Sequence, residues 1–232
     1  MCVCCQNFGV WQATAFILND PADQNNEHMT CRKLLPVTSY LQSLATLTSQ
    51  EVQLIQSCLR VQTLHRMEWL VEQHQQSDCI YFLNSGMIRT VVANENEELT
   101  VWVTLPNHFL SATYSYIKHQ PSIIGLQAIS RAELVYISRT KLKMLFEQIP
   151  ALRSAAIFVM NEYYIELERL YIFCLSQSAR QRYDHLYHHF PEHFLKVPLK
   201  YLASMIHVKP ETLSRIRRLN SRSGNDLLSN VG

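Results

Sequence analysis

The sequence predicts an α+β protein in which a β jelly roll (a double-stranded β-helix) precedes one long helix and a small helical domain. Three observations support this prediction. Short β-rich runs separated by polar turns occupy residues 60–137. A helical pattern without proline or glycine then continues over residues 151–174, and Lys and Arg accumulate in residues 175–222.

The composition excludes several classes of protein. The chain has 232 residues, of which 47% are hydrophobic, enough for one large or two small domains and incompatible with general disorder. Its longest apolar runs are far shorter than the ~18–20 residues that cross a bilayer, and Met1-Cys2-Val3-Cys4-Cys5 lacks the basic start of a secretory signal. We therefore expect a cytoplasmic protein without membrane contact, whose seven cysteines are reduced thiols.

The charge is distributed unevenly. Residues 1–176 carry 12 Lys and Arg against 15 Asp and Glu, whereas residues 177–222 carry nine against three. A basic C-terminal region favours a polyanionic partner, most often nucleic acid, although solvated basic helices have the same composition.

The two ends of the chain carry little pattern. Residues 1–33 contain the breakers Asn19-Asp20-Pro21, so we interpret them as an N-terminal extension, and translation from Met29 would remove most of it. Residues 223–232 are a polar tail. Two short helices are expected over residues 41–59, the second beginning at the capping sequence Thr48-Ser49-Gln50-Glu51.

The β domain is expected within residues 34–150. Its strands are expected at Cys79–Leu83, Met87–Val92, Leu99–Leu105, Ile123–Ile129 and Leu134–Ile137. Ser85-Gly86 separates two of these runs, where glycine permits a positive φ. Residues 94–97 form a polar turn before an alternating strand with Leu99, Val101, Val103 and Leu105 on one side.

The helix over residues 151–174 carries apolar residues spaced 4, 3, 4, 3 and 4 apart: Ala156, Met160, Tyr163, Leu167, Leu170 and Cys174. This spacing is typical of a helix that packs on a second helix along a heptad seam, which predicts dimerisation. An ordinary core helix within one chain has the same pattern, and the sequence leaves that alternative open.

The basic region contains the pattern of a helix-turn-helix over residues 199–219. Pro198 suits the first position of a helix, Leu202 and Ile206 give it an apolar face, and small Ala203 permits close approach of a second helix. Pro210 begins the second helix, whose buried side is expected to hold Leu213, Ile216 and Leu219. His207 stands at the turn, where glycine is frequent, so a left-handed conformation there is costly.

The other side of the second helix is polar and mostly basic: Lys209, Glu211, Thr212, Ser214, Arg215, Arg217 and Arg218. Arginine donates two parallel hydrogen bonds to guanine, glutamate accepts from cytosine, and Lys, Ser and Thr hold phosphates. These residues are therefore candidates for DNA recognition. A charged helical hairpin that binds no DNA is the alternative.

The order of these segments resembles the Crp/Fnr transcription regulators from about Leu35 to Leu219, and Glu211-Thr212-Leu213-Ser214-Arg215 repeats the E-x-x-S-R pattern of the Fnr branch. The resemblance implies a β sensor domain, a homodimer and a winged helix-turn-helix. It also implies that Glu211, Ser214 and Arg215 read the bases of a TTGA-type half-site on double-stranded DNA, and that RNA polymerase is a partner if the protein is an activator. Four stretches look like Bacteroidetes members of the family: Arg182-Tyr183, Val197-Pro198, Leu202-Ala203 and residues 210–217.

The resemblance does not extend to the effector. Relatives that bind cyclic nucleotides have Phe-Gly-Glu and then Arg-Ser/Thr-Ala in a phosphate cassette, whereas this chain has Phe109-Leu110-Ser111 and residues 121–124, Pro-Ser-Ile-Ile. A buried phosphate without a cation is strongly disfavoured. We therefore expect no cAMP response and no cofactor, and the effector stays unknown. Residues 111–119 either line a pocket for another ligand or simply pack.

Several weaker signals in the sequence have ordinary explanations. The spacing of Cys2, Cys4 and Cys5 does not fit an iron–sulfur cluster, and no carboxylate or cysteine completes a metal site among four nearby histidines, which we interpret as surface residues: His185, His188, His189 and His193. The histidines of the β block are scattered and form no H-x-H pair, so an enzyme of the cupin type is not expected. A protein-binding β-sandwich module remains the second functional hypothesis.

Overall fold

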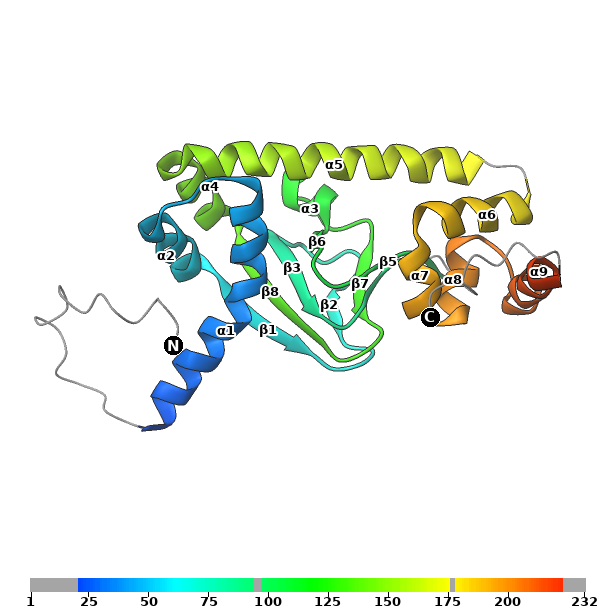
Figure 1. The fold of residues 1–232 in the computed structure, drawn as a ribbon, viewed down its shortest axis with the longest axis horizontal. Coiled ribbons are helices and arrows are strands. Elements are labelled where there is room, and N and C mark those ends of the chain that lie inside the picture. Colours follow the sequence, from blue (N-terminus) through cyan, green and yellow to red (C-terminus); the bar gives the residue numbers. More distant parts are fainter. Residues whose placement is uncertain (1–20, 94–96, 176–177, 223–232) are drawn as a thin grey trace, which may run out of the picture.

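The computed structural model describes residues 21–93, 97–175 and 178–222. The strands lie in the middle of the molecule, between two groups of helices (Figure 1). The elements in chain order are α1 (Pro21–Leu44), α2 (Ser49–Cys58), β1 (Arg60–Leu64), β2 (Trp69–Val71), β3 (Cys79–Ser85), β4 (Ile88–Ala93), β5 (Glu98–Thr104), β6 (Phe109–Leu110), α3 (Thr113–Lys118), β7 (Gly125–Ala128), β8 (Ala132–Ser138), α4 (Arg139–Gln148), α5 (Pro150–Leu175), α6 (Ala179–His189), α7 (Pro191–Lys196), α8 (Leu199–Met205) and α9 (Pro210–Arg222).

The strands form two four-stranded antiparallel sheets with the orders β1-β8-β3-β6 and β2-β7-β4-β5. Leu83, Ile88 and Leu134, each 0% exposed, belong to the core between the sheets. A second core, which includes Phe82 and Val135, lies where α1, α2 and α4 cover the outer face of the first sheet. Successive residues of β3 thus serve different cores, because side chains alternate along a strand.

The five predicted strands are present as β3, β4, β5, β7 and β8. Strands β1, β2 and β6 were not predicted from the sequence. Polar residues interrupt β1, and β6 has only two residues. These strands are fixed by pairing with distant partners, as β1 is with β8, and no local pattern records that pairing.

Gly86 joins β3 to β4 and has a φ of 86°, as its place between two predicted strands indicated. A Cβ atom at this position would lie 2.2 Å from the carbonyl oxygen of Arg131. Glycine is therefore required by both the backbone conformation and the lack of space.

The predicted alternation of β5 is wrong at Val101 and Leu99, because Leu99 pairs with Val92 and lies on the same face as Trp102, opposite Val103. Thr90 pairs with Trp102 and Val91 pairs with Thr100, so Val101 has no partner and forms a β-bulge. Val101 is consequently 37% exposed, whereas Val103 is 0% exposed. The predicted turn at residues 94–97 lies mostly outside the described residues.

The predicted helices are also present, and the capping box at the start of α2 is confirmed by reciprocal bonds between Thr48 and Glu51. One boundary differs, because α1 begins at Pro21, within the segment interpreted as an extension. Lys33 forms an ion pair with Glu133 at 2.8 Å, which ties this helix to the β-sandwich. The short helices α3 and α7 were not predicted.

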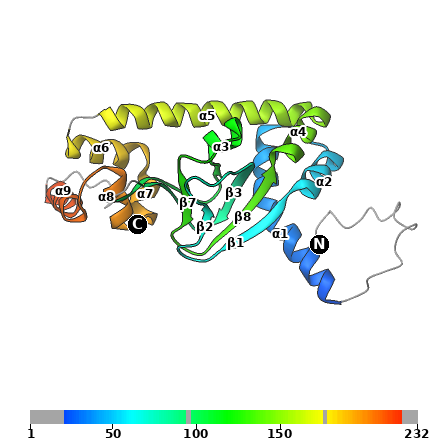
Figure 2. The same ribbon diagram turned by 180° about the vertical axis from the view of Figure 1, so that it is seen from behind.

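The long helix α5 connects the two ends of the molecule (Figures 1 and 2). It runs past the β-sandwich to the C-terminal helices α6–α9, which form a third core together with Val103, Leu105 and Ile129 of the β-sandwich. No strand follows β8 in the described part of the chain, and a wing after α9 would lie outside it. Within the same part, no helix is long and apolar enough to span a membrane.

Candidate nucleic-acid interface

Two helices, α8 and α9, pack together at the C-terminal end of the described chain. Ala203 is 0% exposed, as expected for a small residue at a close helix contact. The turn between the helices is closed by the amide of Val208, which donates to the carbonyl of Ala203 at 3.0 Å. The left-handed conformation expected at His207 is confirmed by its φ of 52°.

The buried side of α9 is shorter than predicted. Leu213 and Ile216 are 1% and 8% exposed, whereas Leu219 is 49% exposed, so its predicted burial is wrong. The seven-residue α8 cannot cover all 13 residues of α9, and Leu219 lies in the uncovered part.

The outer face of α9 presents polar side chains in a single row. Glu211, Ser214, Arg215 and Arg218 occupy positions i, i+3, i+4 and i+7 and are all exposed. Lys209, immediately before the helix, is exposed as well. Among the described residues, the side chain of Arg215 has no hydrogen-bond or ion-pair partner, so its guanidinium group is available to a ligand.

Two of the predicted site residues lie nearer to the protein. Thr212 and Arg217 are half-buried. Arg217 donates from Nη2 to the carbonyl of Phe194 at 3.3 Å, and its guanidinium carbon lies 5.3 Å from the centre of the Phe194 ring. Arg217 therefore holds α9 against α7.

The docking of the C-terminal helices on the β-sandwich was not predicted from the sequence. The amide of Thr100 in β5 donates to Ser204 Oγ at 2.8 Å, and His193 Nε2 donates to the carbonyl of Val103 at 2.9 Å. The Trp102 ring lies 4.5 Å from the His193 ring and 4.9 Å from the Phe190 ring. The sequence feature that could have indicated this docking is Trp102, a large aromatic residue on the side of β5 opposite the predicted apolar row.

A buried arginine lies at the same junction. Arg89 is 7% exposed, donates to Gln127 Oε1 at 2.6 and 2.8 Å, and pairs with Glu98 at 2.6 Å. Its guanidinium carbon lies 5.6 Å from the centre of the Tyr201 ring of α8. Because a buried charge needs several partners, this network fixes the geometry of the sheet surface on which α8 rests.

Two of the four histidines near this unit are less exposed than predicted. His193 is 8% exposed, and its burial lowers its pKa. His185 is half-buried, and its pKa is lowered by burial and by the neighbouring His189. No group of three metal-ligating side chains occurs among the described residues.

The positions that correspond to the charged residues of a phosphate cassette carry uncharged side chains. Leu110 is 9% exposed, and Ser122 is 0% exposed. The hydroxyl of Ser122 donates to the carbonyl of Ile124 at 2.7 Å, so it is already used. Ile123, the next residue, is 57% exposed and directs no charge inwards.

The predicted seam of α5 faces partly towards its own chain. Ala156 lies beside α3 and α4 and Leu170 packs on the C-terminal core, whereas Met160 and Leu167 are 53% and 43% exposed. Tyr163 is 41% exposed, and the side chain of Cys174 lies outside the described set. The exposed apolar row of the structure is shifted slightly round the helix and comprises Ile157, Met160, Tyr164, Leu167 and Tyr171.

Residues 61–149 match the cyclic nucleotide-binding domain family. The β-sandwich has the fold of a cyclic nucleotide-binding domain. The match covers less than half of the chain and ends before α5, so it leaves the C-terminal helices unassigned. No curated protein matches the sequence closely enough to be counted as a relative.

Three solved structures extend the likeness. A CooA mutant from Carboxydothermus hydrogenoformans superposes with a TM-score of 0.61 at 15% identity, over 79% of this chain and 83% of that one. The c-di-GMP responsive global regulator CLP from Xanthomonas campestris gives 0.59 at 15% identity, over 76% and 93%. FixK2 from Bradyrhizobium japonicum gives 0.59 at 12% identity, over 72% and 86%. At these identities the likeness shows a shared fold, and its coverage exceeds that of the β-sandwich.

Proposed function

We propose that this protein is a transcription regulator of the Crp/Fnr type that reads DNA as a homodimer. In this proposal residues 34–150 are a sensor domain, residues 151–174 form the dimerisation helix and residues 175–222 bind DNA. The sequence pattern resembles that of Bacteroidetes members of the family. RNA polymerase is a further partner if the protein activates transcription.

The exposed row on α9 carries this proposal. Arg215 presents a guanidinium group without a partner among the described residues, with Glu211 one turn before it on the same face. This combination suits readout of a G·C pair, because arginine donates to guanine and glutamate accepts from cytosine. Lys209, Thr212, Ser214 and Arg218 are assigned to phosphate or base contacts, and Arg217 to the support of α9.

A TTGA-type palindrome is the proposed target. Two half-sites lie about one DNA turn, ~34 Å, apart, so two copies of α9 are required for tight binding. The exposed apolar row of α5 supplies a surface for the second copy. The likeness to CLP extends over 76% of this chain and 93% of that one. CLP is a global regulator linked to virulence gene expression in its own organism, so the likeness supports the assignment.

The proposal includes neither a cAMP response nor catalysis. Leu110, Ser122 and Ile123 offer no charge for a cyclic phosphate. A second candidate function, a β-sandwich module that binds another protein and does not read DNA, is favoured by the aromatic and apolar exposure along α5. The two proposals differ in what Arg215 does.

The test compares Arg215→Ala with Lys209→Ala on a TTGA-type palindrome and a scrambled duplex over a salt series. Arg215→Ala is expected to lose ~1–3 kcal/mol per half-site on the palindrome and to change little on the scrambled duplex. Lys209→Ala is expected to weaken both duplexes equally and to lower the salt slope by roughly one unit per site.

Equal weakening of the two duplexes by Arg215→Ala would contradict base readout by α9 and favour the protein-binding module. Circular dichroism and thermal unfolding of both variants provide the control, because an exposed side chain without structural partners should leave the fold unchanged.

A further inference from the structure

A large apolar cavity lies beneath α5, outside the β-sandwich interior. Its volume is about 510 Å³. It lies between the outer face of the β1-β8-β3-β6 sheet and the helices α1, α2, α3, α4 and α5, and it opens to solvent beside the exposed residues Ile117, Ile157 and Met160. Its walls include Val37, Leu41, Ile80, Ile137, Leu145 and Leu152. The cavity borders the cassette region discussed above, because Phe109, Leu110 and Ser111 also line it.

The size and chemistry of this cavity suit an apolar ligand. Its volume lies within the range of about 300–1,000 Å³ that is typical of ligand pockets. The residues of α5 that line the cavity extend from Leu152 to Glu166, a length of about 21 Å at 1.5 Å per residue. An elongated hydrocarbon chain fits this shape better than a compact ring system.

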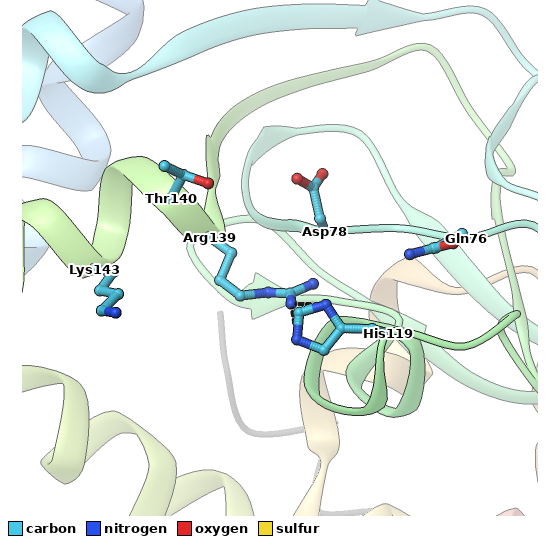
Figure 3. Close-up of a pocket in the computed structure, with 6 residues that line it drawn as sticks. All are labelled: Gln76, Asp78, His119, Arg139, Thr140 and Lys143. Atoms are coloured by element: carbon cyan, nitrogen blue, oxygen red, sulfur yellow. Dashed lines mark hydrogen bonds between the residues drawn. The ribbon is translucent and has the colours of Figure 1, made fainter.

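A second hollow, with a volume of about 680 Å³, lies beside the start of α4 and is polar: it is lined by Gln76, Asp78, His119, Arg139, Thr140 and Lys143. Figure 3 shows Arg139 directed towards the ring of His119, with Lys143 on the next turn of α4. Arg139 Nε is buried and has no hydrogen-bond partner among the described residues. The two cations of Arg139 and Lys143 exceed the single carboxylate of Asp78 by one charge.

The start of α4 adds to this positive potential. The helix begins at Arg139, whose amide donates to the carbonyl of Asp78 at 2.9 Å, and the side chain of Ser138 at its N-cap makes no capping hydrogen bond to the later amides. The first amides of a helix are donors without partners inside the helix, so an uncapped N-terminus attracts anions. Together with Arg139 and Lys143, it makes this hollow a site for a small anionic group.

The two hollows adjoin. Tyr116 lines the apolar cavity, and the centre of its ring lies 5.0 Å from the guanidinium carbon of Arg139, which lines the polar hollow. The same helix serves both, because Leu142 and Phe146 face the cavity whereas Arg139 and Lys143 face the hollow.

We propose that this protein binds a long-chain fatty acid, with the hydrocarbon chain in the cavity beneath α5 and the carboxylate at Arg139 and Lys143. The apolar walls account for the chain, and the excess positive charge at one end accounts for the carboxylate. The inference is independent of the proposed DNA recognition, since it uses residues of the β-sandwich and the helices around it.

The test uses the full chain and the fluorescent fatty acid cis-parinaric acid below its micellar concentration. Saturable binding of one molecule per chain is expected, with displacement by laurate. We expect 1-dodecanol, which lacks the carboxylate, to displace the probe at least about tenfold less well, and Arg139→Gln to weaken probe binding by about the same factor. Lys141→Gln is the matched control, because Lys141 is an exposed cation on α4 that lines neither hollow.

A second variant separates loss of the site from loss of the fold. Leu142→Trp places a larger side chain at a half-buried wall position, and it should reduce binding while the far-ultraviolet circular dichroism stays unchanged. If Leu142→Trp does not fold, Ala156→Leu fills the cavity from α5 instead. No saturable binding, or equal affinity in the wild type and Arg139→Gln, would overturn the proposal, and equal displacement by laurate and 1-dodecanol would overturn its carboxylate component.

Discussion

His193 is one of the residues that join the β-sandwich to the C-terminal helices. It is 8% exposed, donates to the carbonyl of Val103 and lies against Trp102. Protonation would place a second N–H and a positive charge in this apolar contact. The neutral form is therefore the one that the docked arrangement accommodates.

This burial predicts a loss of stability in mild acid. Burial is the largest cause of the lowered pKa of His193; His108 and Lys196 act in the same direction, and Glu192 and the bond to Val103 oppose them. The unfolded chain then binds more protons than the folded one between the folded pKa and about 6.5. The free energy of unfolding, measured in urea, should fall as the pH decreases from about 6.5 and level off below the folded pKa.

His193→Gln tests the assignment, because the glutamine amide still donates to Val103 but does not titrate. At pH 7.5 it should cost less than about 1 kcal/mol, and the decline of stability in acid should be smaller. His188→Gln, an exposed change on α6, is the control. The same acid slope in His193→Gln and wild type would assign the effect elsewhere, with half-buried His185 the next residue to test.

At the scale of the element, the β3–β4 hairpin depends on Gly86. Alanine there must adopt a φ near 86° and place its Cβ atom 2.2 Å from a backbone oxygen. Gly86→Ala should lower the free energy of unfolding by about 2 kcal/mol or more, measured by urea denaturation. Exposed Ser85, changed to alanine, should cost less than about 0.5 kcal/mol. Equal losses would show that the turn relaxes around the new side chain.

The segment from β6 through α3 to β7 holds the residues from which we predict that cyclic nucleotides do not bind. Leu110 and Ser122 are buried and offer no cation to a phosphate, which is costly to desolvate alone. Calorimetry with millimolar cAMP or cGMP should show no saturable heat. A dissociation constant in the micromolar range would mean that another part of the cyclic nucleotide-binding fold supplies the missing charges.

Some elements could be predicted from sequence because their signals are local. The capping box at Thr48, the turn at Gly86 and the unbroken pattern of α5 all depend on neighbouring residues. The bulge at Val101 and the docking of Trp102 depend on strands and helices far away in the chain. The exposed polar face of α9 was predicted from the spacing of its polar residues. The contact of the Arg217 side chain with the protein depends on the position of Phe194, which the spacing does not record.

At the scale of the whole molecule, α5 spans the distance from the β-sandwich to the helices that carry the candidate DNA-reading row (Figure 2). It leaves a long apolar row exposed, which is unusual on a monomer and typical of an interface. The sequence predicted this role but placed Ala156 and Leu170 in the seam, and both face their own chain. The direction of a seam depends on where the helix docks, and the spacing of residues alone does not specify that.

The exposed apolar row of α5 from Ile157 to Tyr171 implies a dimer. Light scattering at micromolar concentration should give about twice the chain mass of 27.0 kDa. Tyr164→Asp combined with Leu167→Asp should dissociate it, because two buried carboxylates would have no partners in an apolar helix pair. Ile165→Asp is the matched control, since Ile165 is also exposed but lies on the far side of the helix. A wild-type monomer, or dissociation by Ile165→Asp alone, would contradict dimerisation along the row from Ile157 to Tyr171.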